Sequence, residues 1–262
     1  MRPNPIKTRL AAGGASYGTM AFEFFTPGLP QIAVAAGAEF LLLDMEHSGI
    51  GLETVKTQIA LCRGLEIVPM VRVPATQYHF IARVLDAGAL GVMVPMVETA
   101  DQARTIVAAT RYPPAGRRGA AFGVAAHDDY RDGPVTDKIA AIHDRTLAIC
   151  LIETATGLEN VDAIAAVPGV DVCWLGHFDM TNFLGIPAQF DHPRYLDAVE
   201  RIVAACRRHG KAPGFMASDL RWAREYGARG FRMIAYGVDV ILLRDALSAG
   251  LAALREDRSA PG

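Results

Sequence analysis

Short apolar segments alternate with longer amphipathic stretches along most of this sequence. The apolar segments are six or seven residues long and rich in Val, Ile, Leu, Met and Phe, which is typical of parallel strands buried on both faces. We predict eight strands, at residues 17–23, 40–46, 67–73, 91–97, 148–153, 171–176, 211–216 and 231–236.

The amphipathic stretches between these strands predict helices, and several of them end just before a glycine that can adopt the left-handed cap conformation. The predicted helices cover residues 30–36, 52–63, 77–86, 100–110, 158–167, 193–209, 220–226 and 238–254. Eightfold strand–helix alternation predicts an α/β fold of the TIM-type (β/α)8 barrel class, for which about 250 residues is an ordinary length. A doubly wound parallel sheet is the alternative. We expect one domain over residues 1–262.

One polar insertion, residues 111–141, separates the fourth strand from the fifth. It is rich in Gly, Pro, Arg and Asp, and long polar loops of barrels are often functional. We therefore expect it on the face where the strands end, with Arg117 or Arg118 either binding an anionic substrate or fixing the loop.

The bulk composition excludes several classes of protein. The formal net charge of −2 provides no basic field for nucleic acid, and no apolar run reaches the ~18 residues of a membrane span. The first ten residues lack the apolar core of a signal peptide, and the four cysteines form no C-x-x-C pair. We expect a cytoplasmic protein without membrane or nucleic-acid partners.

Side chains at the carboxyl ends of barrel strands line the active site, so the polar residues there are the candidates for chemistry. Glu153 and Asp179, from neighbouring strands, would suit a hard divalent ion such as Mg²⁺, unless both simply pair with arginines. His47 is the candidate base, because an unperturbed histidine side chain titrates near neutrality and can both take and return a proton. Arg72 could hold an enolate or carboxylate oxygen, or pair with Glu46 or Glu153.

The distribution of lysines argues against imine chemistry. A Schiff-base aldolase needs a desolvated lysine near a strand end. Lys7, Lys56 and Lys138 fall in the leader, a helix and the insertion, and Lys211 opens a strand at its wrong end. Metal chemistry is therefore the better prediction.

Four stretches carry a resemblance to a known family: LLLDMEH at 41–47, GVMVPMVETADQA at 91–103, RYPPAGRRG at 111–119, and LIETATGLENVDAIAAVPGVDVCWLGHFDMT at 151–181. Over residues 17–247 the chain resembles the HpcH/HpaI aldolases, which have barrels of the phosphoenolpyruvate/pyruvate type. The resemblance implies a metal-dependent (class II) aldolase that cleaves or forms the C3–C4 bond of 4-hydroxy-2-oxo acids, giving pyruvate and an aldehyde. The metal would be Mg²⁺, Mn²⁺ or Co²⁺.

The resemblance also implies roles for individual residues. His47 would transfer the proton with support from Asp86, Arg72 would stabilise the enolate, and Glu153 and Asp179 would bind the metal. It further implies a homohexamer in which the C-terminal helix, about 238–254, is exchanged between subunits.

The substrate-binding turn departs from the pattern of the family. Backbone N–H groups of Gly176, His177, Phe178 and Asp179 would hold the pyruvate carboxylate, but the usual sequence there is Gly-Pro-Ala-Asp. Leu151 also replaces a glutamine that contacts substrate in some members. We expect an acceptor pocket less polar than one for a dicarboxylate semialdehyde.

A CoA-thioester lyase and a non-catalytic binder of 2-oxo acids are the alternative functions.

Overall fold

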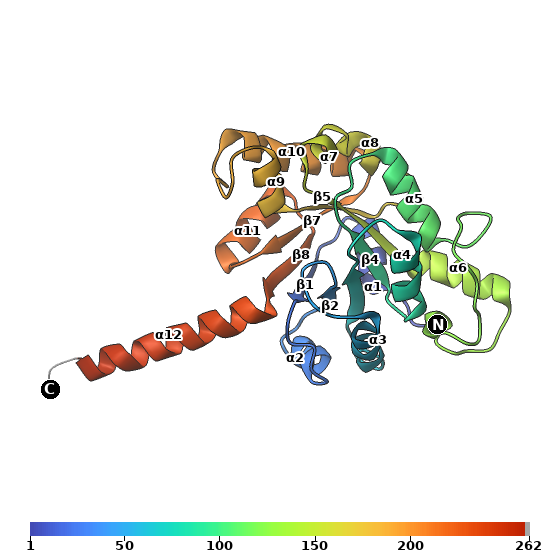
Figure 1. Cartoon of the computed structure of the whole chain (residues 1–262), viewed down its shortest axis with the longest axis horizontal. Helices are drawn as coiled ribbons and strands as arrows, with labels where there is room; N and C mark the ends of the chain where they lie inside the picture. The colour runs from blue at the N-terminus through green and yellow to red at the C-terminus, as the bar shows by residue number, and fades with distance from the viewer. Residues whose placement is uncertain (260–262) are drawn as a thin grey trace.

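The computed structural model describes residues 1–259. Eight parallel strands form a closed barrel in sequence order, which confirms the predicted fold class and the existence of all eight strands (Figure 1). The strands are β1 (Ser16–Ala21), β2 (Phe40–Asp44), β3 (Val68–Arg72), β4 (Gly91–Val94), β5 (Leu147–Ile152), β6 (Val172–Leu175), β7 (Ala212–Ala217) and β8 (Met233–Val238).

Most of the helices follow a strand and belong to the outer layer. The helices are α1 (Pro5–Ala11), α2 (Leu29–Ala35), α3 (Leu52–Leu61), α4 (Tyr78–Asp86), α5 (Ala100–Thr110), the 3-10 turn η1 (Ala126–Asp128), α6 (Val135–Arg145), α7 (Ala155–Glu159), α8 (Val161–Ala165), α9 (His177–Phe183), α10 (Pro193–Arg208), α11 (Leu220–Arg229) and α12 (Asp239–Ser259). The predicted helix at 158–167 is two short helices that meet at Asn160, and α1, α6 and α9 were not predicted.

Large side chains fill the barrel interior and make it a packed core. Phe40 and Trp174 are buried there, and each lies against a glycine of the neighbouring strand, Gly18 and Gly214. A Cβ at either glycine would overlap the ring, so small residues on one strand accommodate large ones on the next. The interior is therefore solid beneath the carboxyl ends, and a site can form only above it.

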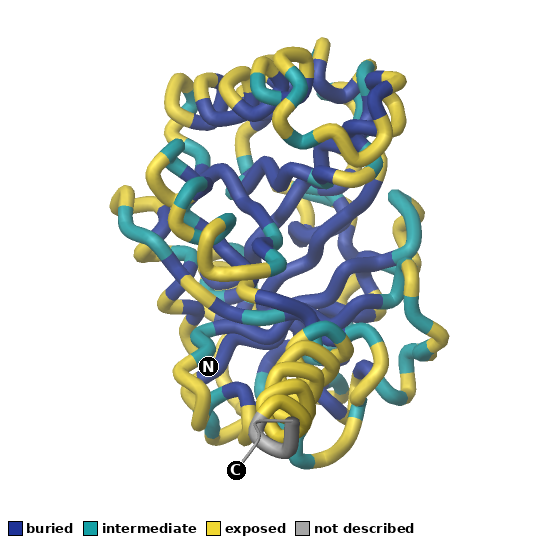
Figure 2. Tube along the Cα trace, turned by 90° about the vertical axis from the view of Figure 1, so that its left-hand side faces the viewer, coloured by how far each residue is buried: buried dark blue, intermediate teal, exposed yellow. Residues whose placement is uncertain are grey.

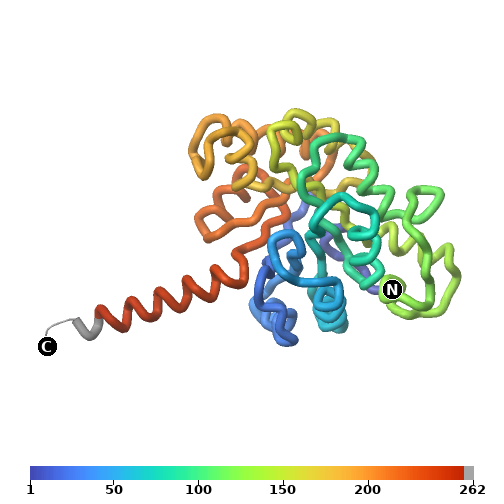
Figure 3. Tube along the Cα trace, in the orientation of Figure 1, coloured from blue at the N-terminus to red at the C-terminus, as the bar shows by residue number. Residues whose placement is uncertain are grey.

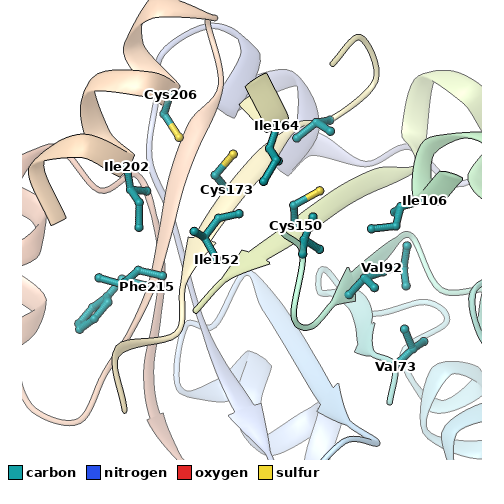
Figure 4. Close-up of a cluster of buried hydrophobic side chains, with 14 of the residues drawn as sticks. Val73, Val92, Ile106, Cys150, Ile152, Ile164, Cys173, Ile202, Cys206 and Phe215 are labelled. Carbon is teal, nitrogen blue, oxygen red and sulfur yellow. The ribbon is translucent and has the colours of Figure 1, made fainter. Parts of the chain in front are cut away.

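A second apolar layer joins the outer faces of the strands to the helices (Figure 4), and the barrel strands are buried along most of their length (Figure 2). Cys150 on β5, Cys173 on β6 and Cys206 on α10 all lie in it, and the four cysteines are buried and unpaired with one another as disulfides. They behave as small apolar residues that complete this layer.

The insertion lies at the opposite end of the barrel from the one we predicted. It follows α5, which runs back to the amino ends of the strands, and it packs beside the start of the chain. Arg2 links the two regions, because its backbone N–H donates to Oδ2 of Asp129 in the insertion (2.7 Å). The polar composition of the insertion therefore does not indicate a place near the carboxyl ends of the strands.

The last helix, α12, projects away from the barrel (Figures 1 and 3). Asp239 at its base accepts hydrogen bonds from the backbone N–H groups of Phe22, Glu23 and Phe24, at 2.7 to 3.1 Å, and so ties it to the β1–α2 loop. Leu243, Leu247, Leu251 and Leu254 form an exposed apolar stripe along it. Within residues 1–259, no helix is both long and apolar enough to span a membrane.

Candidate active site

Asp44 organises the turn after β2. Its buried carboxylate accepts the backbone N–H groups of Glu46 (3.2 Å) and His47 (2.8 Å), and also Nε–H of Arg72 (2.5 Å). β2 ends at Asp44, two residues earlier than predicted, because the N–H groups of Glu46 and His47 turn back to the Asp44 side chain. One carboxylate thus positions the candidate base and the candidate cation together.

Arg72 ends β3 directly beside Asp44, its partner in the strand register. Its guanidinium lies 5.3 Å from the Phe22 ring centre, and Nη1 is 3.2 Å from Oε2 of Glu46. Nη2 is buried without a hydrogen-bond partner among the described protein atoms. This donor is available to a substrate oxygen, which fits the predicted role of Arg72.

Glu46 lies between Arg72 and His47. Its Oε2 is 3.7 Å from Nε2 of His47, whose imidazole is more than half exposed. Burial raises the pKa of Glu46, while Arg72 and His47 oppose that rise. From the sequence, Glu46 is a candidate only as a partner of Arg72, although its place next to His47 at a strand end is a usable signal.

Glu153 is almost completely buried just beyond β5. Oε1 accepts the backbone N–H of Met96 (2.7 Å), which has a left-handed φ of 55° that non-glycine residues seldom adopt. A Cβ at residue 176 would lie 2.5 Å from Oε2, so Gly176 leaves room for the carboxylate. Burial raises the pKa of Glu153 to about 7, and nearby Glu46 and Asp179 contribute to the rise.

Asp179 stands in the first turn of α9, and no side chain caps that helix. The N–H of Gly176 is not free, because it donates to the carbonyl of Ile152 (3.0 Å). The turn can therefore bind a carboxylate through its later N–H groups, since the first N–H groups of a helix have no partners within it. Gly176 contributes the space beside Glu153 instead.

The His177 side chain is not a candidate base. It is buried among the rings of Phe178, Phe190, Phe215 and Trp222, with ring centres 4.8 to 5.7 Å apart. Burial lowers its pKa to about 4, so the imidazole is neutral at ordinary pH. Any contact of His177 with substrate is through its backbone. Leu151, also a predicted contact residue, is buried in the barrel interior with Trp174.

Glu46 and Asp179 both help to raise the pKa of Glu153, and Asp179 also helps to raise the pKa of Glu46, while Arg72 is already paired with Asp44. This excess of carboxylates fits a divalent cation, and Glu153 and Asp179 have the hard oxygen donors that Mg²⁺ and Mn²⁺ prefer. No group of three His, Cys, Asp or Glu residues in the described chain is arranged to hold a metal. Substrate and water would have to supply the remaining ligands.

Asp86 lies at the end of α4, where the chain turns toward the amino end of β4, whereas His47 follows the carboxyl end of β2. It pairs with Nη2 of Arg118 (2.7 Å), and Nδ1 of the buried His127 is 3.8 Å away. The two predicted members of the His47–Asp86 pair therefore lie at opposite ends of one barrel. The order of the predicted helix 77–86 and strand 91–97 already puts Asp86 at the amino end, whereas its role beside His47 rests on resemblance alone.

The lysines also lie away from the site. Lys7 Nζ donates to the carbonyl of Thr146 (2.6 Å), and Lys138 pairs with Asp128 (2.8 Å), both at the amino end. Lys56 is exposed on α3, and Lys211 immediately precedes β7. Their positions agree with the argument against an imine.

Three of the known proteins that resemble this chain are named as aldolases, which agrees with the geometry of the candidate site. The chain is 35% identical over 258 residues to 2-keto-3-deoxy-L-rhamnonate aldolase of Klebsiella pneumoniae, covering 98% of this chain and 96% of the relative. It is 34% identical over 254 residues to hydroxypyruvate/pyruvate aldolase of Roseovarius nubinhibens, covering 97% and 98%. The crystal structure of an HpcH/HpaI aldolase from Desulfitobacterium hafniense superposes with a TM-score of 0.91 at 28% identity, covering 98% of both chains.

These relatives match the chain along almost its entire length, so the fold and the type of reaction agree: the protein is a carbon–carbon lyase of the aldolase type. The family profile described as HpcH/HpaI aldolase/citrate lyase matches residues 23–246. The chain belongs to the HpcH/HpaI aldolase/citrate lyase family.

Proposed function

We propose that this aldolase depends on a divalent metal held by Glu153 and Asp179, and that it acts on 4-hydroxy-2-oxo acids. The observation that carries the proposal is the cluster of poorly neutralised carboxylates at the strand ends, where the pKa of Glu153 rises to about 7 beside an Arg72 that keeps one buried donor unpaired. Perturbed acids together with a free cationic donor are typical of catalytic sites.

A divalent ion bound by these carboxylates would supply a Lewis acid for the 2-oxo group. Arg72 Nη2 would donate to the same oxygen and stabilise the negative charge that develops there in the enolate. The N–H groups of His177, Phe178 and Asp179 would orient the substrate carboxylate.

His47 would take the proton of the 4-hydroxyl, directly or through one water, at an imidazole that is accessible to solvent. The C3–C4 bond then breaks, its electron pair remains on pyruvate as the enolate, and the 4-carbon leaves as an aldehyde. Protonation at C3 completes the release of pyruvate. In synthesis, the same groups act in reverse.

Because of its place in the fold, Asp86 could support only the His47 of another copy of the chain. We therefore propose that Asp86 has this role in a homo-oligomer, the predicted homohexamer, in which α12 is exchanged between subunits. The leucine stripe of α12 is exposed, and an apolar groove beside its base is lined by exposed Tyr17, Ile32 and Tyr236. Two unpartnered apolar surfaces of this kind suit burial against a second copy.

The test measures pyruvate release from a panel of 4-hydroxy-2-oxo acids, with and without a chelator, by the wild type and His47→Ala. Release should require metal, and His47→Ala should reduce it by about 100-fold or more. His79→Ala, an exposed histidine on α4, is the control and should retain activity. If pyruvate and metal bind but no substrate releases pyruvate, the proposal is wrong, and a CoA-thioester lyase or a non-catalytic binder becomes the better account.

A further inference from the structure

The connections that follow the strands at their carboxyl ends carry acids but few cations. Residues 22–28, 45–51, 73–77, 95–99, 153–154, 176 and 218–219 contain no lysine or arginine. They do contain Glu23, Glu46, Glu98, Glu153 and Asp219. The potential over this face is therefore negative wherever a bound metal does not neutralise it.

Arg72 is the cation at this rim, and its charge is largely neutralised by ion pairs. It pairs with Asp44 and Glu46, and its unpaired Nη2 is needed for the 2-oxo acid. Two exposed arginines stand in the first turns of helices that begin at this end, Arg194 on α10 and Arg221 on α11, and Arg221 has Glu225 as its partner at 3.6 Å. Within a single copy of the chain, the connections at the carboxyl end therefore offer the carboxylate of an acceptor aldehyde no lysine or arginine.

Apolar side chains border the two metal-binding candidates. Met96 follows β4, donates its N–H to Glu153 and leaves 41% of its surface exposed. Phe178 directly precedes Asp179, is 54% exposed, and rests edge-on against Phe190 at 5.2 Å between ring centres. Phe22 lies under the guanidinium of Arg72. Large apolar side chains left open around a polar centre are typical of a ligand pocket.

We propose that the acceptor aldehyde of this enzyme is uncharged with an apolar tail, and that Met96 and Phe178 contact that tail. The inference rests on the proposed function, because it assigns the second substrate of the same site. The flexible Met96 can adapt to tails of different shape, and Phe178 offers a rigid ring face. The acidic rim disfavours anionic acceptors by repulsion.

The experiment compares aldehydes of the same size in aldol addition to pyruvate. Succinic semialdehyde and 4-methylpentanal have equal numbers of heavy atoms. The first ends in a carboxylate and the second in an isopropyl group. We expect kcat/KM to favour 4-methylpentanal by about tenfold or more. Met96→Gln and Phe178→Ala should each reduce this ratio severalfold. Phe183→Ala, an exposed phenylalanine farther along α9, should leave it unchanged. Because the ratio compares two acceptors within one variant, a general loss of activity cancels.

A second measurement separates this inference from the proposed function. Metal-dependent exchange of the pyruvate methyl protons with D₂O reports enolate formation and needs no acceptor. If exchange occurs but succinic semialdehyde is preferred, the acceptor inference is overturned and the proposed function stands. If exchange is absent with every metal, the proposed function itself fails.

Discussion

The two ends of the barrel both contain many charged side chains, but they use them differently. At the amino end the charges are paired: Lys138 with Asp128, Arg145 with Asp129, and Lys7 with Asp171, at 2.8 to 3.4 Å. At the carboxyl end, Glu46, Glu153 and Asp179 outnumber the cations available to them. Paired charges hold segments together, whereas the unbalanced carboxylates are arranged for a ligand that brings positive charge.

Asp86 and its neighbours are the exception at the amino end. Tyr112 Oη, Arg118 Nε and both nitrogens of His127 are buried without hydrogen-bond partners in the described protein. Unsatisfied buried groups require an explanation, such as water or a partner. Asp86, whose side chain is 35% exposed, is the member of this cluster that a second copy could contact in the homo-oligomer proposed above.

The largest effect is expected from removing a carboxylate at the carboxyl end. Glu153→Gln keeps the size of the side chain but removes its charge, so metal binding should fail and kcat/KM should fall at least about 1,000-fold. Glu159→Gln, an exposed glutamate on α7, is the matched control. Calorimetry with Mn²⁺ and pyruvate-release rates check both variants, and metal affinity equal to wild type in Glu153→Gln would refute the assignment.

Arg72→Lys should have the next largest effect. Lysine keeps the charge but cannot bond Asp44 and a substrate oxygen with one planar group, so we expect a loss of about 100-fold that falls mainly on kcat. Steady-state kinetics separate kcat from KM. A change confined to KM would mean that Arg72 only helps to bind the ground state.

The pH dependence of metal affinity gives a smaller effect with a defined sign. A pKa of about 7 means that Glu153 is protonated below neutrality in the metal-free protein, and a metal must displace that proton. Apparent affinity should therefore weaken by up to about tenfold per unit as the pH falls below 7, and level off above it. Titrations with Mn²⁺ between pH 5.5 and 8 test this, and a flat profile would contradict it.

Lys138→Met should change activity least and stability most. It leaves the fully buried Asp128 without its cation, which typically destabilises a protein by about 3–5 kcal/mol. Chemical denaturation measures that loss, and kcat of the remaining folded enzyme should stay near wild type. A large drop in kcat without a loss of stability would show that the two ends do not divide the work as described.

The sequence predicted the strands well because each is a short apolar run buried on both faces, such as residues 40–44 and 147–152. It also predicted the convergence of His47, Arg72 and Glu153, because barrel topology brings strand ends together. It could not show that Asp44 ties Arg72 to the His47 turn, since that depends on side-chain hydrogen bonds between strands. The insertion was misplaced because its polar composition was given more weight than its position after α5.

One measurement tests the central claim most directly: exchange of the pyruvate methyl protons in D₂O, followed by NMR, for the wild type and Glu153→Gln with and without Mg²⁺ or Mn²⁺. The account predicts exchange by the wild type only when metal is present, and almost none by Glu153→Gln under any condition. Exchange that survives a chelator, or that Glu153→Gln retains, would contradict the claim that the carboxylates at the carboxyl end of the barrel hold the metal that stabilises the enolate.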